Sequence, residues 1–475
     1  MSEHLLLSSP FLLKSPLQSS SLLDSLPLDF RLLLSPPNQS HLFLLEPQLL
    51  SELAATQQPD FNAEDFRWRF SLPPAFRYRA NSLTVGIFAE DVPKVNLSSL
   101  NWTEQKRIAG AYGPFNQSST SSNLQFLQHA FYQKTITSKL NSTLPKNTTL
   151  HLHLVVLFPV RQLLWIGAID EDTLFTLNDG DEENPTRTTV VHYGRTAEEI
   201  FDPFKTAVLK TDSKRSLPQN ILVPDDIGHL LSQLPTARYL HCDPAKTAAW
   251  FTQYNQTENA GKVEASRRAI SRMKSLMRRM RMQFWAVCGT LLGWYRQCSV
   301  TPYTTDTDFA SWAKYVRAEA AEQEEEVNRN DKRPKKLRSL TELLKAEAAH
   351  HQLYLLNRFG EPWHSLEYSF ATTGDRWEKA DLFFVYPNRS HYLLPFHVPP
   401  QYAYSVYPRY GLCSGELLGF KVQVPCTPLE VITAEYGAEW QTPVSSWSYY
   451  EAPKNIGPLL PFAFANVSQH ESFSE

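Results

Sequence analysis

The sequence predicts an α/β protein of the α+β type, in which a mixed α/β domain precedes a second domain built on a mixed sheet. Three observations support this prediction. Short apolar runs of strand length alternate with polar loops through the first half of the chain. An amphipathic helical pattern follows near residue 263, and apolar strands that contain single aspartates come after it. The 475 residues are sufficient for two or three domains, and 42% hydrophobic residues are sufficient for their cores.

The first half of the chain divides into a leader and a domain. Residues 1–60 are rich in Leu, Ser and Pro, and we expect a weakly ordered leader there. Residues 61–245 are interpreted as a separate mixed α/β domain. Its clearest element is the apolar run 151–160, which is too short for a membrane span and is predicted to be a buried strand. The sequence assigns no function to this domain.

The second domain, residues 262–465, begins with a predicted helix at residues 263–282. Ile270, Met273 and Met277 recur at helical spacing, and seven basic residues occupy the rest of its surface. This basic surface either faces phosphate-bearing ligands or an anionic membrane, or is the solvated side of a packed helix, which we prefer. A charged insertion at residues 319–345 forms either two helical pieces or a disordered hairpin.

The end of this domain carries clear helix signals. Residues 420–425 alternate as a strand. A capping box from Thr427 to Glu430, with Pro428 at the first helical position, then predicts a helix that ends at Gly437.

The strongest functional signal is a pair of aspartates downstream of a strand and a small-residue turn. The apolar strand 284–287 leads into Gly289 and Thr290, whose backbone N–H groups can approach a phosphate closely. Asp306 and Asp308 follow at a spacing that places both carboxylates on one face of a strand. Two adjacent anions repel unless a cation lies between them, and Mg²⁺ or Mn²⁺ prefers such oxygen ligands. The pattern favours a metal-assisted phosphoryl-type transferase.

A third carboxylate, Asp381, lies in the apolar strand 380–386, and a further candidate strand, 366–370, precedes it. An ionised aspartate in such a strand needs a partner. That partner is either a metal shared with Asp306 and Asp308, which we prefer, or a neighbouring cation such as Lys379 or Arg376.

An ordered series of motifs resembles the family of fukutin and the LicD-type phosphocholine transferases. The series covers about two hundred residues. It comprises GTLLGWYRQC from Gly289, Asp306-x-Asp308, LEYSF from Leu366, Lys379-x-Asp381-x-Phe383-Phe384, YPRYGLC from Tyr407, and KVQVPC from Lys421 with Leu429-Glu430, Tyr436-Gly437 and Trp440 after it. The chain departs from the family at Thr307, where an apolar residue is usual, and at the blurred ending near residues 453–458.

This resemblance implies a nucleotidyltransferase-type fold and a reaction. Asp306, Asp308 and Asp381 would be catalytic and hold one or two Mg²⁺ (or Mn²⁺) ions, while Gly289, Thr290 and Arg296 would bind the donor. Ribitol 5-phosphate would pass from CDP-ribitol to the O-mannosyl glycan of a dystroglycan-like glycoprotein. Arg296 is alternatively a structural residue, and the general base is not identified. Rival functions are nucleotidyl transfer with release of pyrophosphate, phosphocholine-type transfer, and a non-catalytic scaffold for Golgi glycosyltransferases.

Composition and sequons bear on the compartment. A net charge of −3 provides no field that would recruit nucleic acid. Nine Asn-x-Ser/Thr sequons, six of them before residue 150, indicate a glycosylated protein of the secretory lumen: Asn38, Asn96, Asn101, Asn116, Asn141, Asn147, Asn255, Asn388 and Asn466.

The five cysteines form no C-x-x-C pair, which argues against a zinc ribbon, and their odd number leaves at least one thiol free. Cys413 and Cys426 either form a disulfide or are buried thiols. The family resemblance implies a Golgi membrane protein, yet Pro and charged residues interrupt every apolar run in residues 1–50. We therefore expect either an apolar segment upstream of Met1 or retention by a partner.

Overall fold

A computed structural model describes most of the chain between residues 43 and 461. The described residues are 43–45, 47, 49–51, 53, 82–94, 97–112, 125–136, 147–160, 163–166, 187–193, 204–210, 220–236, 238–280, 282–316, 340–372, 379–398, 401–449 and 452–461. They fold into two compact units that divide mainly between Tyr239 and Leu240. Both units are mixtures of helices and sheets, which confirms the predicted α+β class.

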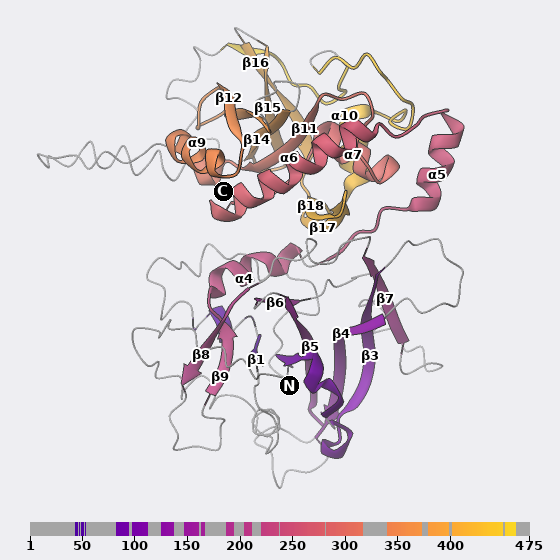
Figure 1. Ribbon diagram of the computed structural model, residues 1–475, viewed down its shortest axis with the longest axis vertical. Helices are drawn as coiled ribbons and strands as arrows, with labels where there is room; N and C mark the ends of the chain where they lie inside the picture. Colours follow the sequence, from indigo (N-terminus) through magenta and orange to yellow (C-terminus); the bar gives the residue numbers. More distant parts are fainter. Residues whose placement is uncertain are drawn as a thin grey trace, which may run out of the picture. The chain divides into compact units, whose positions relative to one another are not determined.

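The N-terminal unit is built on one mixed sheet (Figure 1). Strand β5, Thr149–Val160, confirms the buried strand predicted at residues 151–160, and Leu150, Val155 and Leu157 on it are fully buried. The order of strands is β7-β3-β4-β5-β2-β1-β9-β8, with β6 also pairing with β5. Their bounds are β1 Phe43–Leu44, β2 Ser82–Phe88, β3 Thr103–Tyr112, β4 Gln125–Thr135, β6 Leu163–Ile166, β7 Arg187–Tyr193, β8 Thr206–Lys210 and β9 Asn220–Pro224, and helix α4 covers Ile227–Gln233.

Strand β1 differs from the weakly ordered leader expected at residues 1–60. Phe43 and Leu44 pair with β2 on one side, Phe43 pairs with Leu222 of β9 on the other, and both side chains are buried. Two apolar residues are too few to show the alternation of apolar and polar residues that identifies a strand, so the sequence gives no signal for a strand of this length. The remainder of the expected leader that precedes residue 43 lies outside the described residues.

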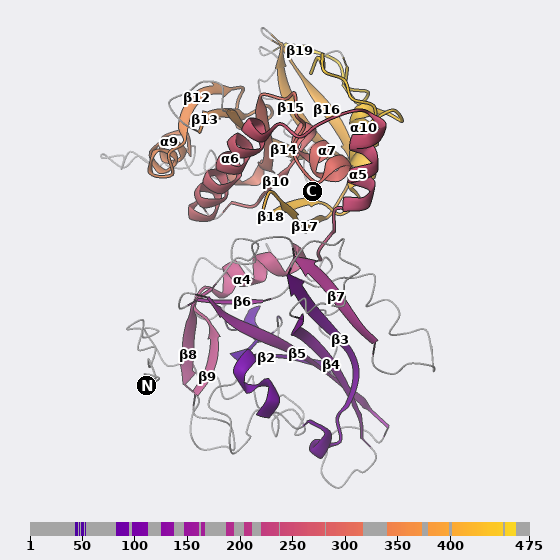
Figure 2. The same ribbon diagram turned by 45° about the vertical axis from the view of Figure 1, so that its right-hand side comes forward.

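The C-terminal unit contains an eight-stranded sheet and a separate hairpin (Figure 2). The sheet runs β10-β11-β14-β15-β16-β19, and β13 pairs with both β14 and β12. The strands are β10 Phe284–Ala286, β11 Asp306–Trp312, β12 Tyr354–Phe359, β13 Glu367–Ala371, β14 Lys379–Pro387, β15 His391–Val398, β16 Gln401–Pro408 and β19 Leu460–Pro461, and β17 Leu412–Leu417 and β18 Phe420–Pro425 form the hairpin. The helices are α5 Pro244–Gln253, α6 Ala260–Arg279, α7 Cys288–Gln297, α9 Leu340–His350 and α10 Pro428–Tyr436.

Helix α6 confirms the amphipathic helix predicted at residues 263–282, shifted by three residues toward the N-terminus. The side chain of Asn259 caps it by accepting from the Lys262 N–H at 3.1 Å. Its apolar side is buried through Ile270, Met273 and Met277. Several basic residues contact protein groups, since Arg272 donates to the Gln352 carbonyl and the Arg267 guanidinium lies over the Phe420 ring. These contacts favour the packed-helix interpretation.

Helix α10 ends as predicted but begins differently. Gly437 follows its last residue with φ 75°, a left-handed conformation that glycine adopts without strain. Pro428 is the first helical residue, as predicted, yet the Thr427 side chain makes no capping hydrogen bond. The predicted capping box is therefore wrong, because Thr427 has ψ 65° rather than the extended backbone that aims a capping side chain into the first turn.

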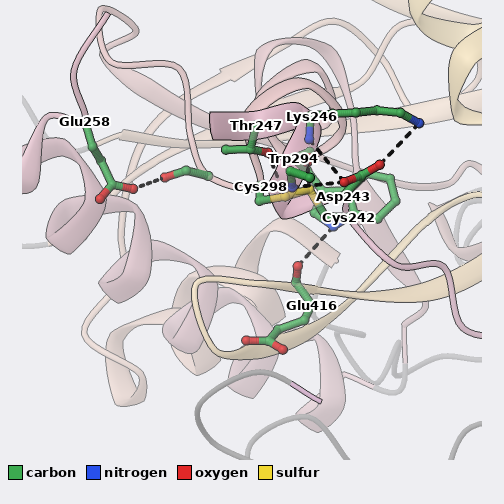
Figure 3. Close-up of a disulfide and its surroundings, with 10 residues drawn as sticks. Cys242, Asp243, Lys246, Thr247, Glu258, Trp294, Cys298 and Glu416 are labelled. Carbon is green, nitrogen blue, oxygen red and sulfur yellow. Dashed lines mark hydrogen bonds and ion pairs between the residues drawn. A yellow bond between two sulfur atoms is a disulfide. The ribbon is translucent and has the colours of Figure 1, made fainter. Parts of the chain in front are cut away.

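Two disulfides brace the C-terminal unit. Cys413 and Cys426 are bridged, with Cα atoms 5.0 Å apart, so the first alternative of the sequence analysis is confirmed for this pair. Cys242 and Cys298 form a second disulfide that the sequence did not predict; it joins the segment before α5 to the end of α7 (Figure 3). Cys288 is a free cysteine.

The charged insertion at residues 319–345 lies largely outside the described residues, although its last six residues form the start of α9. Among the described residues, no helix is both long and apolar enough to cross a membrane.

Candidate metal centre

Asp306, Asp308 and Asp381 converge at the centre of the C-terminal sheet. Strands β11 and β14 are parallel neighbours in a register that places Asp308 directly beside Asp381. Asp306 lies two residues before Asp308 and so shares its face. One carboxylate oxygen of each residue lies within 4.8 Å of those of the other two. Three carboxylates at this spacing form a ligand set suited to a hard divalent cation.

Thr307 lies between the two aspartates and points to the opposite face of β11. Its hydroxyl donates to the Ser266 hydroxyl of α6 at 3.0 Å, and both side chains are buried. The polar residue at this position is therefore matched by a polar partner on the helix behind the sheet. This pairing accounts physically for the departure from the apolar residue expected there.

The carboxylates are held in an environment that disfavours their charge. Asp308 is 8% exposed and Asp381 is 9% exposed. Burial raises the pKa of Asp308 well above its usual range, and Asp306 and Asp381 raise it further. Burial also raises the pKa of Asp381, to about 6, although the hydrogen bond from Ser369 opposes this shift. A bound cation would relieve the repulsion, so the cluster fits a metal.

Hydrogen bonds fix the geometry of the cluster. The Thr304 hydroxyl donates to Asp306 Oδ1 at 2.6 Å. Lys262, in the first turn of α6, donates from Nζ to the Asp306 carbonyl at 2.7 Å. The charge of Lys262 lowers the pKa of both Asp308 and Asp381, so this lysine partly compensates the cluster. Sequence reasoning missed Lys262, which precedes the helix predicted at residues 263–282, because its position gave no indication of the strand that it meets.

Gly289 and Thr290 lie at the start of α7, next to Asp308. A Cβ atom at position 289 would lie 3.4 Å from Asp308 Oδ2, so glycine leaves the carboxylate uncovered there. The Thr290 hydroxyl accepts from the Asp308 N–H at 2.7 Å and therefore fixes the strand to the helix. The N-cap residue of α7, Val287, makes no side-chain capping hydrogen bond to the first turn. The structure thus brings both residues to the carboxylates, and their contact with a donor phosphate stays a prediction.

Arg296, the third residue predicted to bind the donor, lies at the far end of α7 and is 4% exposed. Its guanidinium donates to Gln297 Oε1, to the Trp440 carbonyl at 3.2 Å and to the Tyr303 hydroxyl. It also lies over the Trp250 ring, 4.5 Å from its centroid. These contacts engage every nitrogen of the guanidinium. They favour the structural role that the sequence analysis gave as the alternative for Arg296, and a contact with phosphate stays a prediction.

A second buried acid, Glu435 of α10, lies behind the start of α7. It is 5% exposed and accepts from the Tyr407 hydroxyl at 2.6 Å. Burial raises its pKa to about 7, although hydrogen bonds from Tyr407, Tyr436 and Cys288 oppose the shift. Sequence reasoning missed Glu435, because one acid near a helix end carries no signal of burial.

The raised pKa of Glu435 predicts a pH-dependent stability. Because the folded chain favours the neutral acid, this contribution is fully present below pH ~4.5 and is lost as the pH rises through about 7. Glu435→Gln stays neutral at every pH. Its melting temperature relative to wild type should therefore rise between pH 5 and pH 8, by the equivalent of up to about 3 kcal/mol. Glu361→Gln, a change at an exposed residue, serves as the control. The prediction would be contradicted if the melting temperatures of Glu435→Gln and wild type, measured by differential scanning calorimetry, changed with pH in parallel.

Comparisons with known proteins match the part of the chain that contains these residues. Residues 281–427 match the model of the LicD/FKTN/FKRP nucleotidyltransferase domain, a range that contains all three aspartates with Gly289 and Thr290. The chain is 28% identical to ribitol-5-phosphate transferase FKTN of Homo sapiens over 244 residues, which are 50% of this chain and 47% of that protein. It is 27% identical to the FKTN protein of Mus musculus over 245 residues, again 50% of this chain and 47% of the relative.

A further relative is the uncharacterized protein W02B3.4 of Caenorhabditis elegans, 27% identical over 284 residues, 57% of this chain and 66% of that protein. The chain spans about half the length of the curated FKTN relatives that it matches. The similarity and the site therefore fall in the same region of the chain, and together they support a fukutin-like protein with a LicD-type nucleotidyltransferase domain.

Proposed function

We propose that this protein transfers an alditol phosphate, ribitol 5-phosphate by analogy with the FKTN relatives, from a CDP-linked donor to a hydroxyl of an O-mannosyl glycan on a glycoprotein. The observation that carries the proposal is the convergence of Asp306, Asp308 and Asp381 within 4.8 Å at the start of α7. Phosphoryl transfer needs little covalent help from a protein and depends on positioning and on charge stabilisation.

Each part of the site has a role in this reaction. Asp306, Asp308 and Asp381 would hold Mg²⁺ or Mn²⁺, which supplies charge stabilisation for the departing CMP. Gly289 leaves room beside Asp308 for a donor phosphate, and the uncapped first turn of α7 directs N–H groups and a positive dipole end toward it. Lys262 and the hydroxyl of Ser369 favour the ionised form of the carboxylates, against the effect of burial, and hold them in place.

Three rival functions use the same domain and differ in their products. Nucleotidyl transfer would move CMP to the acceptor and release pyrophosphate, and a phosphocholine-type transfer would use CDP-choline and release CMP. A scaffold for Golgi glycosyltransferases would release neither. The two buried carboxylates and the adjacent Asp306 count against the scaffold, because repulsion among the three costs stability that a bound cation would recover.

The deciding experiment measures products from a panel of donors. Protein from a secretory expression host, in which the disulfides form, is incubated with Mg²⁺, an O-mannosyl glycopeptide and CDP-ribitol, CDP-glycerol, CDP-choline or CTP. CMP release with CDP-ribitol, together with a mass increase of the acceptor by one ribitol phosphate, is the expected result. Pyrophosphate release, transfer from CDP-choline alone, or no product with any donor would contradict the proposal.

We also propose a lumenal location in the secretory pathway, held there by membrane association or by a partner. Two disulfides in the C-terminal unit suit an oxidising compartment. Among the described sequons, Asn101, Asn147 and Asn255 are exposed, so each is accessible to glycosylation.

Protein from a secretory host is therefore expected to carry N-glycans, chiefly before residue 150, because six of the nine sequons lie there. Peptide mass spectrometry after glycosidase treatment would identify the modified asparagines. Asn101→Gln and Asn147→Gln should each remove one glycan. Unchanged gel mobility of the wild-type protein after glycosidase treatment would contradict the lumenal location.

A further inference from the structure

A fourth acid, Glu367, lies beside the three aspartates without belonging to their cluster. Strand β13 pairs with β14 in a register that places Ser369 opposite Asp381 and Glu367 opposite Phe383. The Ser369 hydroxyl donates to Asp381, so the Ser369 side chain points to the carboxylate face. Glu367 is two residues earlier on the same strand and therefore shares that face, about 7 Å along it.

Glu367 is close enough to the three aspartates to feel their charges but is not one of the grouped metal ligands. Among the described residues, the group of acids within 4.8 Å of one another contains only the three aspartates. Burial raises the pKa of Glu367 well above its usual range, and the charges of Asp381 and Asp306 raise it further, while Lys379 opposes them. Glu367 thus faces the same space as the aspartates and remains available for a different task.

The side chain of Glu367 is buried beside a histidine, and its described neighbours provide no positive charge that pairs with it. Glu367 is 9% exposed, and its Oε2 lies 3.8 Å from His397 Nε2 on β15. That Nε2–H donates to the Ser365 carbonyl at 2.8 Å, and burial lowers the pKa of His397, so this histidine is neutral near pH 7. Among the described residues, no lysine or arginine forms an ion pair with Glu367. A buried acid without a cation partner takes up a proton readily, which is a property that a proton acceptor needs.

We propose that Glu367 is the general base that accepts the proton of the acceptor hydroxyl, an inference that rests on the proposed function. As the acceptor oxygen forms its bond to the alditol-bearing phosphorus, its proton passes to Glu367. The bond from that phosphorus to the oxygen of CMP breaks, and CMP leaves with the electron pair. Glu367 then returns the proton to solvent, so the balance is donor plus acceptor alcohol giving phosphodiester, CMP and a proton.

The spacing suits this role better than it suits a metal ligand. A base lies about 3 Å from the hydroxyl that it deprotonates, and the attacking oxygen lies about 3 to 3.5 Å from the phosphorus. The base is therefore at most about 6.5 Å from the phosphorus, and a phosphate bound beside the aspartates would come within this reach, because about one strand repeat of 7 Å separates Glu367 from the rung of Asp381. The aspartates themselves would be engaged with the cation and so are poorer proton acceptors.

The test compares Glu367→Gln, which is nearly isosteric, with wild type and with the exposed-residue control Glu361→Gln. Transfer from CDP-ribitol by Glu367→Gln should fall about 100-fold or more, the usual contribution of a general base. Its Mn²⁺ affinity, measured by calorimetry or electron paramagnetic resonance, should stay within about twofold of wild type, unlike that of Asp381→Asn. Formate added to Glu367→Ala should restore part of the rate. The kcat of wild type should also decrease as the pH is lowered, because Glu367 becomes protonated. The kcat of Glu367→Gln should not show this decrease.

Each contrary result has a distinct meaning. Wild-type-like transfer by Glu367→Gln, or a rate of Glu367→Ala that formate does not change, would overturn the role of Glu367 alone. A tenfold loss of Mn²⁺ affinity in Glu367→Gln would overturn it in favour of a fourth metal ligand. If Glu367→Gln does not fold, Glu367→Asp is tested in its place. The proposal would then be overturned if the kcat of Glu367→Asp fell at acid pH in the same way as that of wild type. No product from wild type with any donor would refute the proposed function itself, and the base with it.

Discussion

Asp308→Asn is expected to lose Mn²⁺ binding and to lower CMP release by at least ~100-fold, equivalent to about 3 kcal/mol of lost transition-state stabilisation. Asparagine is nearly isosteric with aspartate, so the backbone bond from the Asp308 N–H to Thr290 survives the change. It removes one anion from a site in which Asp306 and Asp381 already oppose its charge. The melting temperature without metal should therefore equal that of wild type or exceed it.

The corresponding changes at the other two aspartates extend this test. Asp306→Asn and Asp381→Asn should also each lower CMP release by at least ~100-fold, because each removes one anionic ligand. Glu264→Gln is the matched control, since it removes an exposed carboxylate of α6 in the same unit and should leave the rate unchanged. The measurements are CMP release and thermal melting, with and without Mg²⁺. Transfer at the wild-type rate by well-folded Asp308→Asn would remove the metal centre from the mechanism.

The sequence predicted the elements of the site because each carries its own local signal. Residues 284–287 and 380–386 are apolar enough to be recognised as strands, and the structure has β10 and β14 there. Asp306 and Asp308 alternate with Thr307, so their common face follows from strand period alone. These features depend on neighbours within a few residues, and a sequence displays such neighbours directly.

What the sequence could not predict depends on contacts between distant segments. The pairing of Asp308 with Asp381 follows from the parallel register of β11 and β14, which are separated by about seventy residues. The disulfide between Cys242 and Cys298 likewise joins residues 56 positions apart, and no spacing rule selects that pair from five cysteines.

Arg296 shows the opposite case, in which a family motif suggested donor binding and the contacts favour the structural alternative. Its place in the GTLLGWYRQC run from Gly289 indicated donor binding, but one α7 helix separates it from the carboxylate end. Two of the groups around it, the Trp250 ring and the Trp440 carbonyl, come from segments that precede and follow it in the sequence. A motif reports that a residue matters, and only the three-dimensional contacts show whether it matters for packing or for catalysis.

Gly293→Ala should lower the stability of the C-terminal unit by about 2 kcal/mol, because α7 touches backbone at this position. A Cβ atom there would lie 2.7 Å from the Ser299 carbonyl oxygen and 2.9 Å from the Thr301 nitrogen. Backbone atoms cannot rotate away as a side chain can, so the segment after α7 must move. The preference of helices for alanine, about 1 kcal/mol over glycine, offsets only part of this cost.

The movement should also reach the site, since the Thr301 hydroxyl donates to the Gly289 carbonyl at 3.3 Å. We therefore expect CMP release to fall about tenfold even below the melting temperature, because small misplacements of groups that position the donor slow phosphoryl transfer. Gly261→Ala is the matched control: it lies in the first turn of α6, where a Cβ atom would meet nothing closer than Asn259 Oδ1 at 3.5 Å. That variant should be equally stable or slightly more stable. Equal melting temperatures for Gly293→Ala and Gly261→Ala, with equal rates, would show that the contact between α7 and residues 299–301 does not position the site.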